Sequence, residues 1–139
     1  MIIQDLRVGN WYMSVKWKQP VQCELTDFYE IYSRSDGAYD DPPISEIFEP
    51  IPLTEEWLIK FGFKRVEMMF EKITTLYWRK DRLKLYRVHT SAVSEDWFYE
   101  VWFADDHDNE AVIRLRLDLV HQLQNLYYAL TGEELKINL

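Results

Sequence analysis

Hydrophobic and polar residues alternate in two short segments near the start of the chain. In WYMSVKWK, residues 11–18, every second side chain from Trp11 onward is apolar, and VQCELT, residues 21–26, alternates in the same way. A period of two with aromatic and β-branched residues is typical of half-buried strands, so these segments predict a hairpin that turns at the intervening QP. Cys23 falls on the apolar side, which predicts a small core residue rather than a nucleophile.

Helical spacing marks two later segments. In EPIPLTEEWLIKFGF, residues 49–63, Thr54 suits an N-cap and Gly62 suits the position just after a helix. Near the end of the chain, apolar residues recur at helical spacing, and a Thr–Gly pair follows them at Gly132. We therefore expect a short middle helix and a C-terminal helix over about residues 118–130 that lies on a sheet.

The region between the two helices reads as strands. Leu83 and Leu85 alternate with Lys84 and Tyr86, and DWFYEVWFA, residues 96–104, carries aromatic residues at both parities. Residues 68–89 suggest strands that meet at a turn near RKDR, residues 79–82. The predicted fold class is α+β: a single domain over residues 1–139, with an antiparallel sheet packed by the middle helix and the C-terminal helix. Residues 1–50 form its β-rich part with an acidic loop, and residues 51–139 hold both helices and the remaining strands.

Composition limits the class of protein. The chain has 139 residues, 47% hydrophobic and 16% aromatic, which excludes a disordered chain and suits one domain with a real core. A single cysteine rules out an intramolecular disulfide framework. No signal-peptide pattern opens the sequence, and no apolar run approaches the roughly 18–20 residues that span a bilayer. We therefore expect a cytoplasmic protein that does not enter a membrane.

Charge is unevenly distributed along the chain. The net charge of −8 argues against general coating of nucleic acid. Residues 23–56 hold ten acidic residues and one basic residue, residues 72–89 hold six basic and one acidic, and residues 90–110 hold seven acidic and none basic. Ordinary solvated faces would explain this pattern. The alternative is a charge-segregated surface that steers a charged partner.

The sequence singles out no reaction centre. DDHDNE, residues 105–110, is the most metal-like cluster, but it lacks the central glycine of a calcium loop and has Leu117 where the twelfth-position glutamate belongs. A solvated turn is the better interpretation. The three histidines are scattered, and GxSxG, P-loop and GxGxxG motifs are absent from the sequence. We expect no catalytic residue, no cofactor and no metal site.

A basic strip interleaved with aromatic residues is the leading candidate for binding. Such a strip suits single-stranded nucleic acid or an acidic protein partner, and a covered sheet face or plain solvated charge is the alternative. The candidate residues of the strip are Trp78, Arg79, Arg82, Lys84, Tyr86, Trp102, Arg114 and Arg116. Candidates for acidic contacts with a partner are Asp36, Asp40, Asp41, Asp105, Asp106 and Asp108.

Three stretches carry a family resemblance. DLRVGNW near the start, FEPIPLTEEWLIKFGF in the middle and VHQLQNLYYALTGEEL at the end resemble a family of small uncharacterised proteins from phages and mobile elements of Bacteroidetes bacteria. The resemblance implies an SH3-like opening part, in which Gly9 permits a turn before the first strand. Because the family has no assigned reaction, it implies no catalytic residues.

A phage setting implies a role among inhibitors of host defence. The expected function is a non-enzymatic binding protein that inhibits a host defence nucleoprotein, like an anti-CRISPR protein, through charge complementarity. The expected partner is a host protein or nucleoprotein such as a CRISPR effector nuclease, in the bacterial cytoplasm. A self-assembling structural phage protein, with homo-oligomers as its form, is one alternative. An RNA- or single-stranded-DNA-binding module is the other.

Overall fold

The computed structural model describes residues 6–34, 44, 46–89, 97–104 and 110–137. The chain forms two compact units, which we describe one at a time: residues 1–52 with 119–134, and residues 53–118 with 135–139. Both units contain antiparallel strands and at least one helix, so the predicted α+β class is confirmed. Among the described residues, no helix is both long and apolar enough to cross a membrane.

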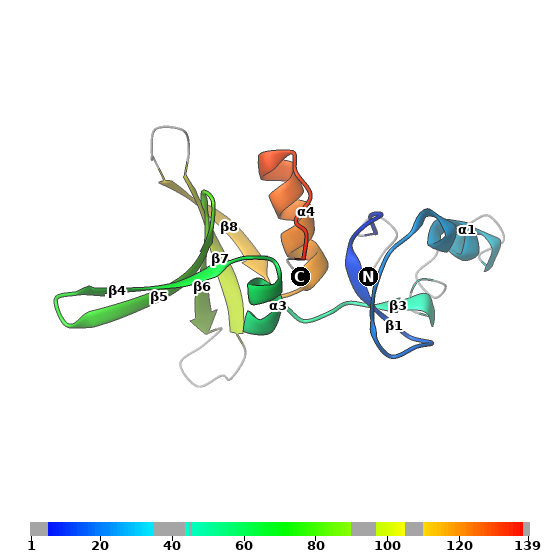
Figure 1. Ribbon diagram of the computed structural model, residues 1–139, viewed down its shortest axis with the longest axis horizontal. Helices are drawn as coiled ribbons and strands as arrows, with labels where there is room; N and C mark the ends of the chain where they lie inside the picture. Colours follow the sequence, from blue (N-terminus) through cyan, green and yellow to red (C-terminus); the bar gives the residue numbers. More distant parts are fainter. Residues whose placement is uncertain (1–5, 35–43, 45, 90–96, 105–109, 138–139) are drawn as a thin grey trace. The chain divides into compact units, whose positions relative to one another are not determined.

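In the described residues, the first unit contains a three-stranded antiparallel sheet together with helices α1 and α4 (Figure 1). The strand order is β2-β1-β3, with Tyr12 opposite Val21 and Ser14 opposite Phe48. In the described residues this sheet is open, with β2 and β3 at its two edges. The elements of the unit are β1 (Trp11–Ser14), β2 (Pro20–Gln22), α1 (Leu25–Arg34), β3 (Phe48–Glu49) and α4 (Val120–Thr131).

Helix α1 is where the first unit departs from the sequence pattern. Alternation over residues 21–26 predicted a strand, but β2 ends at Gln22 and the helix begins at Leu25. The Asp27 carboxylate accepts the backbone N–H of Glu24 at 2.6 Å, which stabilises the turn that starts the helix. Leu25, which the alternation placed on the apolar side, is 76% exposed. The strand prediction beyond Gln22 is therefore wrong.

The core of the first unit is built around Tyr12. Its ring lies 5.2 Å from that of Phe48 and 5.2 Å from that of His121 on α4, centroid to centroid. The predicted C-terminal helix is thus confirmed, and it packs on the small sheet through β1. Cys23 is buried in the same core, as its place in the alternation predicted.

Where the structure describes it, the second unit is a five-stranded antiparallel meander with helix α3. The strand order follows the chain, β4-β5-β6-β7-β8, so each strand pairs with its sequence neighbour. The turn predicted near residues 79–82 is confirmed, because Asp81 and Arg82 join β5 to β6. The elements are α3 (Glu55–Lys60), β4 (Lys64–Phe70), β5 (Ile73–Lys80), β6 (Leu83–His89), β7 (Trp97–Ala104) and β8 (Glu110–Leu117).

Helix α3 occupies the predicted place and covers one face of this meander. Thr54 is its N-cap residue, and Gly62 follows it with φ of 86°. The Lys80 ammonium donates to the Phe61 carbonyl at 2.7 Å, which ties β5 to the end of the helix. Side chains buried in the unit include Trp57, Leu58, Phe61, Phe63, Trp78, Leu83, Leu85, Tyr99, Val101 and Leu117.

The strands form two sheets, whereas the sequence predicted one. The two sheets are separated along the chain by the segment between β3 and α3, which contains Pro50 and Pro52. Proline lacks the N–H that a continuing ladder needs, so a strand cannot run on through this segment. The strand alternation identified most of the strands but carried no information about which sheet each one joins.

Candidate binding surface

Strand register gathers one row of aromatic and charged residues on the face of the meander opposite α3. Tyr77 on β5 stands opposite Tyr86 on β6, Tyr86 opposite Glu100 on β7, and Glu100 opposite Arg116 on β8. A neighbouring row joins Arg79, Lys84 and Trp102. Paired residues share a face, so both rows lie on one side of the sheet. We call this surface the aromatic–basic face; its members are Lys64, Val66, Tyr77, Arg79, Lys84, Tyr86, Phe98, Glu100, Trp102 and Arg116.

Three rings form a continuous line across the central strands of this face. The Tyr77 and Tyr86 centroids are 5.2 Å apart, and Tyr86 meets Trp102 edge to face at 5.8 Å. Tyr77 is buried, while the other two rings are half-buried. The Trp102 indole N–H donates to the Glu100 carboxylate at 2.9 Å, which fixes the ring's orientation. The rings therefore form a preorganised apolar floor.

Cationic groups lie above the rings of this face. The Lys84 ammonium is 5.4 Å from the centroid of the Tyr77 ring. The Arg116 guanidinium is 5.2 Å from the centroid of the Phe98 ring, and its Nε donates to the Asp118 carboxylate at 3.1 Å. Cation–π contacts of this kind hold a positive charge in place over an apolar surface. Ring edges and fixed cations are what the face offers to a partner.

Most predicted strip residues lie on or beside this face, but Trp78 does not. Trp78 pairs with Leu85, points to the α3 side and is 4% exposed. It follows Tyr77 directly, and adjacent strand residues point to opposite faces, so the two rings cannot share a surface. As a contact residue Trp78 is a wrong choice: it belongs to the core.

The other predicted residues fall in three places. Arg79, Lys84, Tyr86, Trp102 and Arg116 share the aromatic–basic face. Exposed Arg82 lies in the β5–β6 turn, where its carbonyl accepts the Ala104 N–H at 3.0 Å. Arg114 belongs to β8 at an irregularity in its pairing with β7, and its side chain is outside the described part of the chain. The acidic candidates Asp36, Asp40, Asp41, Asp105, Asp106 and Asp108 also lie outside the described residues.

Sequence reasoning missed Phe98 as part of the surface. The signal was present, because Phe98, Glu100 and Trp102 share one parity in DWFYEVWFA. What the sequence did not reveal is that this parity matches that of Lys84 and Tyr86, which requires the β6–β7 register. Register decides which strand parities meet on one face.

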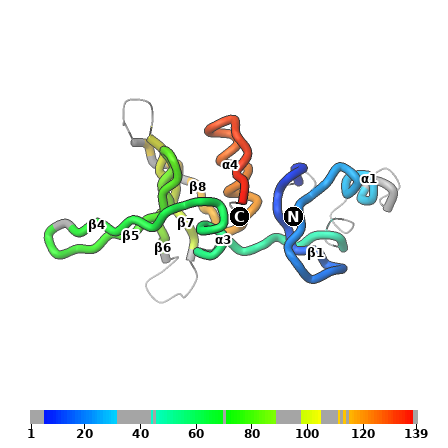
Figure 2. Tube along the Cα trace, in the orientation of Figure 1, coloured from blue at the N-terminus to red at the C-terminus, as the bar shows by residue number. Residues whose placement is uncertain are grey.

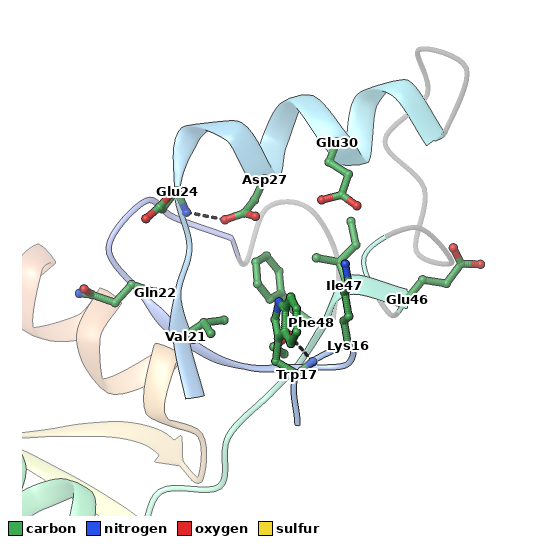
Figure 3. A pocket seen from close by; sticks show the side chains of 11 residues that line it. Lys16, Trp17, Val21, Gln22, Glu24, Asp27, Glu30, Glu46, Ile47 and Phe48 are labelled. Carbon is green, nitrogen blue, oxygen red and sulfur yellow. Dashed lines mark hydrogen bonds between the residues drawn. The ribbon is translucent and has the colours of Figure 1, made fainter. Parts of the chain in front are cut away.

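A separate pocket of about 290 Å³ lies within the first unit (Figure 3). The exposed indole of Trp17 forms part of its wall, with the Lys16 ammonium 4.8 Å from the ring centroid. Apolar side chains of Val21, Ile47 and Phe48 line it as well. Its carboxylates are those of Glu24, Asp27, Glu30 and Glu46. The described part of the acidic stretch over residues 23–56 thus contributes four carboxylates to one pocket.

Cys23 has no features of a reactive thiol. Burial is the largest of three causes that together raise the pKa of this thiol to about 12, and the nearby Asp27 and Glu24 carboxylates are the other two. A thiol with such a pKa is protonated at neutral pH, and the thiolate is the nucleophilic form. In the described residues, no group of three or more His, Cys, Asp or Glu side chains is placed to hold a metal ion. Residues 105–109, the metal-like stretch, are outside that set.

Comparison of this chain with protein-family models, curated proteins and solved structures found no match. The resemblance to phage and mobile-element proteins therefore stays a prediction, and the argument for function depends on the surface itself.

Proposed function

We propose that this chain is a non-enzymatic binding protein that uses the aromatic–basic face to hold an acidic surface of a partner protein. The observation that carries the proposal is the placement of Lys84 and Arg116 over the rings of Tyr77 and Phe98. Arg, Tyr and Trp dominate the energetics of protein interfaces, because rings exclude water around the charges that contact the partner. A carboxylate that binds there meets a cation already held in position.

The same geometry favours protein over single-stranded nucleic acid. Bases bind by stacking on ring faces, and here cations lie above the rings of Tyr77 and Phe98. Tyr77 is buried besides, and its hydroxyl donates to the Met68 sulfur at 3.7 Å. The chain's net charge of −8 also opposes a close approach to phosphates. RNA or single-stranded DNA is the second candidate ligand, supported by the number of cations on this face.

The family resemblance suggests the biological role and the partner of this binding protein. A phage protein of this kind would inhibit a host defence nucleoprotein, such as a CRISPR effector, in the bacterial cytoplasm. The acidic pocket of the first unit, with Glu24 and Glu46 among its carboxylates, supports the proposal as a second contact for a basic groove.

The test is capture of partners from a native bacterial lysate with the tagged full-length chain, followed by identification of bound protein and RNA. We expect one protein to be enriched, with or without its guide RNA. Lys84→Glu should weaken its binding by about tenfold, which is about 1.4 kcal/mol. Lys136→Glu, an equal charge change at an exposed residue outside the sheet, is the matched control.

The outcome also separates the two candidate ligands. A protein partner that stays bound after nuclease treatment supports the proposal. RNA recovered without any protein favours the nucleic-acid candidate, and its binding should then weaken steeply with salt. Equal loss of binding in Lys84→Glu and Lys136→Glu would contradict the aromatic–basic face as the contact surface.

A further inference from the structure

The β4–β5 hairpin extends beyond the rest of its sheet. β5 pairs with β6 only from Tyr77 to Lys80, whereas its pairing with β4 continues to Ile73. Figure 2 shows the two strands running together away from β6, β7 and β8. The outer half of the hairpin is therefore a two-stranded ribbon, and such ribbons are marginally stable by themselves.

Apolar side chains on this ribbon are exposed. Met69 is 77% exposed, Ile73 68% and Met68 54%. β4 is also an edge strand: in the described residues it pairs only with β5. An edge strand with exposed apolar side chains is a template for pairing with another strand.

Turn geometry shows which backbone groups of β4 point outward. Glu71 and Lys72, with φ of 48° and 69°, form the two-residue connection between Phe70 and Ile73. In such a hairpin the closing pair exchanges hydrogen bonds, and along β4 every second residue does the same. Met68, Val66 and Lys64 therefore bond to β5, and the N–H and C=O groups of Arg65, Glu67 and Met69 point away from it.

We propose that β4 pairs antiparallel with β4 of a second copy of this chain, in a register centred on Val66. This register places Arg65 of each copy opposite Glu67 of the other, and both residues have outward backbone groups that can exchange hydrogen bonds. The two side chains lie on one face of β4 and already form an ion pair at 3.2 Å within one copy. Opposite charges directly across a strand pair stabilise it.

Charge disfavours the two neighbouring registers. Centring the pair on Arg65 would place two arginines opposite each other, and centring it on Glu67 would place two glutamates there. Like charges directly opposite are destabilising. Charged side chains on an edge normally discourage foreign strands, but the order Arg65–Val66–Glu67 is complementary to itself. The edge is thus suited to a copy of the same chain.

The symmetry of this pairing has a consequence for the binding surface. Antiparallel pairing of identical strands creates a two-fold axis normal to the sheet, so equivalent faces of both copies lie on the same side. Val66 lies on the aromatic–basic face, so the two such faces would join across the new strand pair.

The test is a charge swap in the full-length chain, measured by light scattering during gel filtration and by native mass spectrometry over a concentration series. For the wild-type chain, the fraction of dimer should increase with protein concentration. Arg65→Glu and Glu67→Arg should each be monomeric, because each places like charges opposite. An equimolar mixture of these two variants should form a heterodimer, and the double variant R65E/E67R should again form a homodimer.

Two variants control for other effects. Lys136→Glu has the same charge change as Arg65→Glu and should dimerise like the wild type. Glu67→Pro removes one outward N–H while leaving the bonds to β5 intact, so it should be folded, by circular dichroism, and monomeric. A wild-type chain that is monomeric throughout the series would overturn the proposal. So would a dimer that survives Arg65→Glu, or a mixture of single variants that stays monomeric.

Discussion

The Asn10 side-chain amide donates to the Asn125 side-chain oxygen at 2.7 Å, joining residues 115 positions apart. The same oxygen accepts the Nε–H of Arg7 at 2.9 Å, and Arg7 reaches Glu134 at 2.6 Å. Gln124 completes the network: its oxygen accepts the Trp11 N–H at 2.8 Å. Two of the stretches that carry the family resemblance, DLRVGNW and VHQLQNLYYALTGEEL, thus meet in one polar cluster. This cluster fixes α4 to the N-terminal part of the first unit.

Asn125→Ala should destabilise the fold by about 1–3 kcal/mol, because it leaves donors of buried Asn10 and half-buried Arg7 without their acceptor. Urea denaturation followed by circular dichroism measures the change. Asn125→Asp keeps an acceptor oxygen at the same place and should lose less stability. Equal losses in the two variants would show that the shared oxygen is not what holds the cluster.

Elements with strong local signals could be predicted from the sequence, and those set by tertiary context could not. The C-terminal helix and α3 combine helical spacing with a suitable glycine stop, and the structure has both. Helix α1 was missed because residues 21–26 alternate like a strand, and only the contact of Asp27 with the Glu24 N–H reveals the turn. The alternation favoured a strand, but the hydrogen bond at the start of the helix stabilises α1 instead.

The candidate surface was predictable within each strand but not between strands. The alternation separated Lys84 and Tyr86 from the leucines beside them, as β6 confirms. Trp78 was misplaced because it was assigned to the same strip as its neighbour Arg79, although adjacent strand residues point to opposite faces. Phe98 was missed because the register between β6 and β7 is a property of the folded sheet.

Truncation of Trp78 should mainly reduce stability, and truncation of Tyr86 should mainly reduce partner binding. Trp78→Ala removes a buried ring and should cost about 3–5 kcal/mol of stability. Tyr86→Ala removes a half-buried ring from the aromatic–basic face, so it should cost less stability and weaken partner binding. Denaturation and the capture experiment measure the two effects. A Tyr86→Ala chain that is folded and captures its partner normally would contradict the role assigned to this face.

Gly132 should be sensitive to substitution for a purely backbone reason. It ends α4 with φ of 74°, its N–H donates to the Tyr128 carbonyl at 2.8 Å, and no atom lies within 4 Å of an added Cβ. Gly132→Ala should therefore cost about 1–2 kcal/mol through left-handed strain alone. Gly132→Asn, which tolerates that conformation better, should cost less in thermal denaturation. An alanine variant as stable as the wild type would show that the helix ends differently.

The buried thiol of Cys23 should make stability depend on alkaline pH. Its pKa in the folded chain is raised to about 12 from an ordinary value of 9.0, so between these values the unfolded chain loses a proton that the folded chain keeps. Ionisation of the thiol then favours unfolding. The contribution of Cys23 to the free energy of unfolding therefore falls by up to about 1.4 kcal/mol per pH unit above pH 9. Below pH 9 the contribution is fully present.

Cys23→Ala isolates that contribution from other groups that titrate in the same range. We expect wild type to exceed the variant in stability at pH 7.5, because the substitution leaves a small cavity. That difference should shrink when urea denaturation is repeated at pH 9.5 and 10.5. The folded thiol should also resist a disulfide reagent at pH 8 and react once urea is added, since burial keeps it protonated. A constant difference across the pH series, with rapid reaction in the folded chain, would show that Cys23 is accessible and its pKa ordinary.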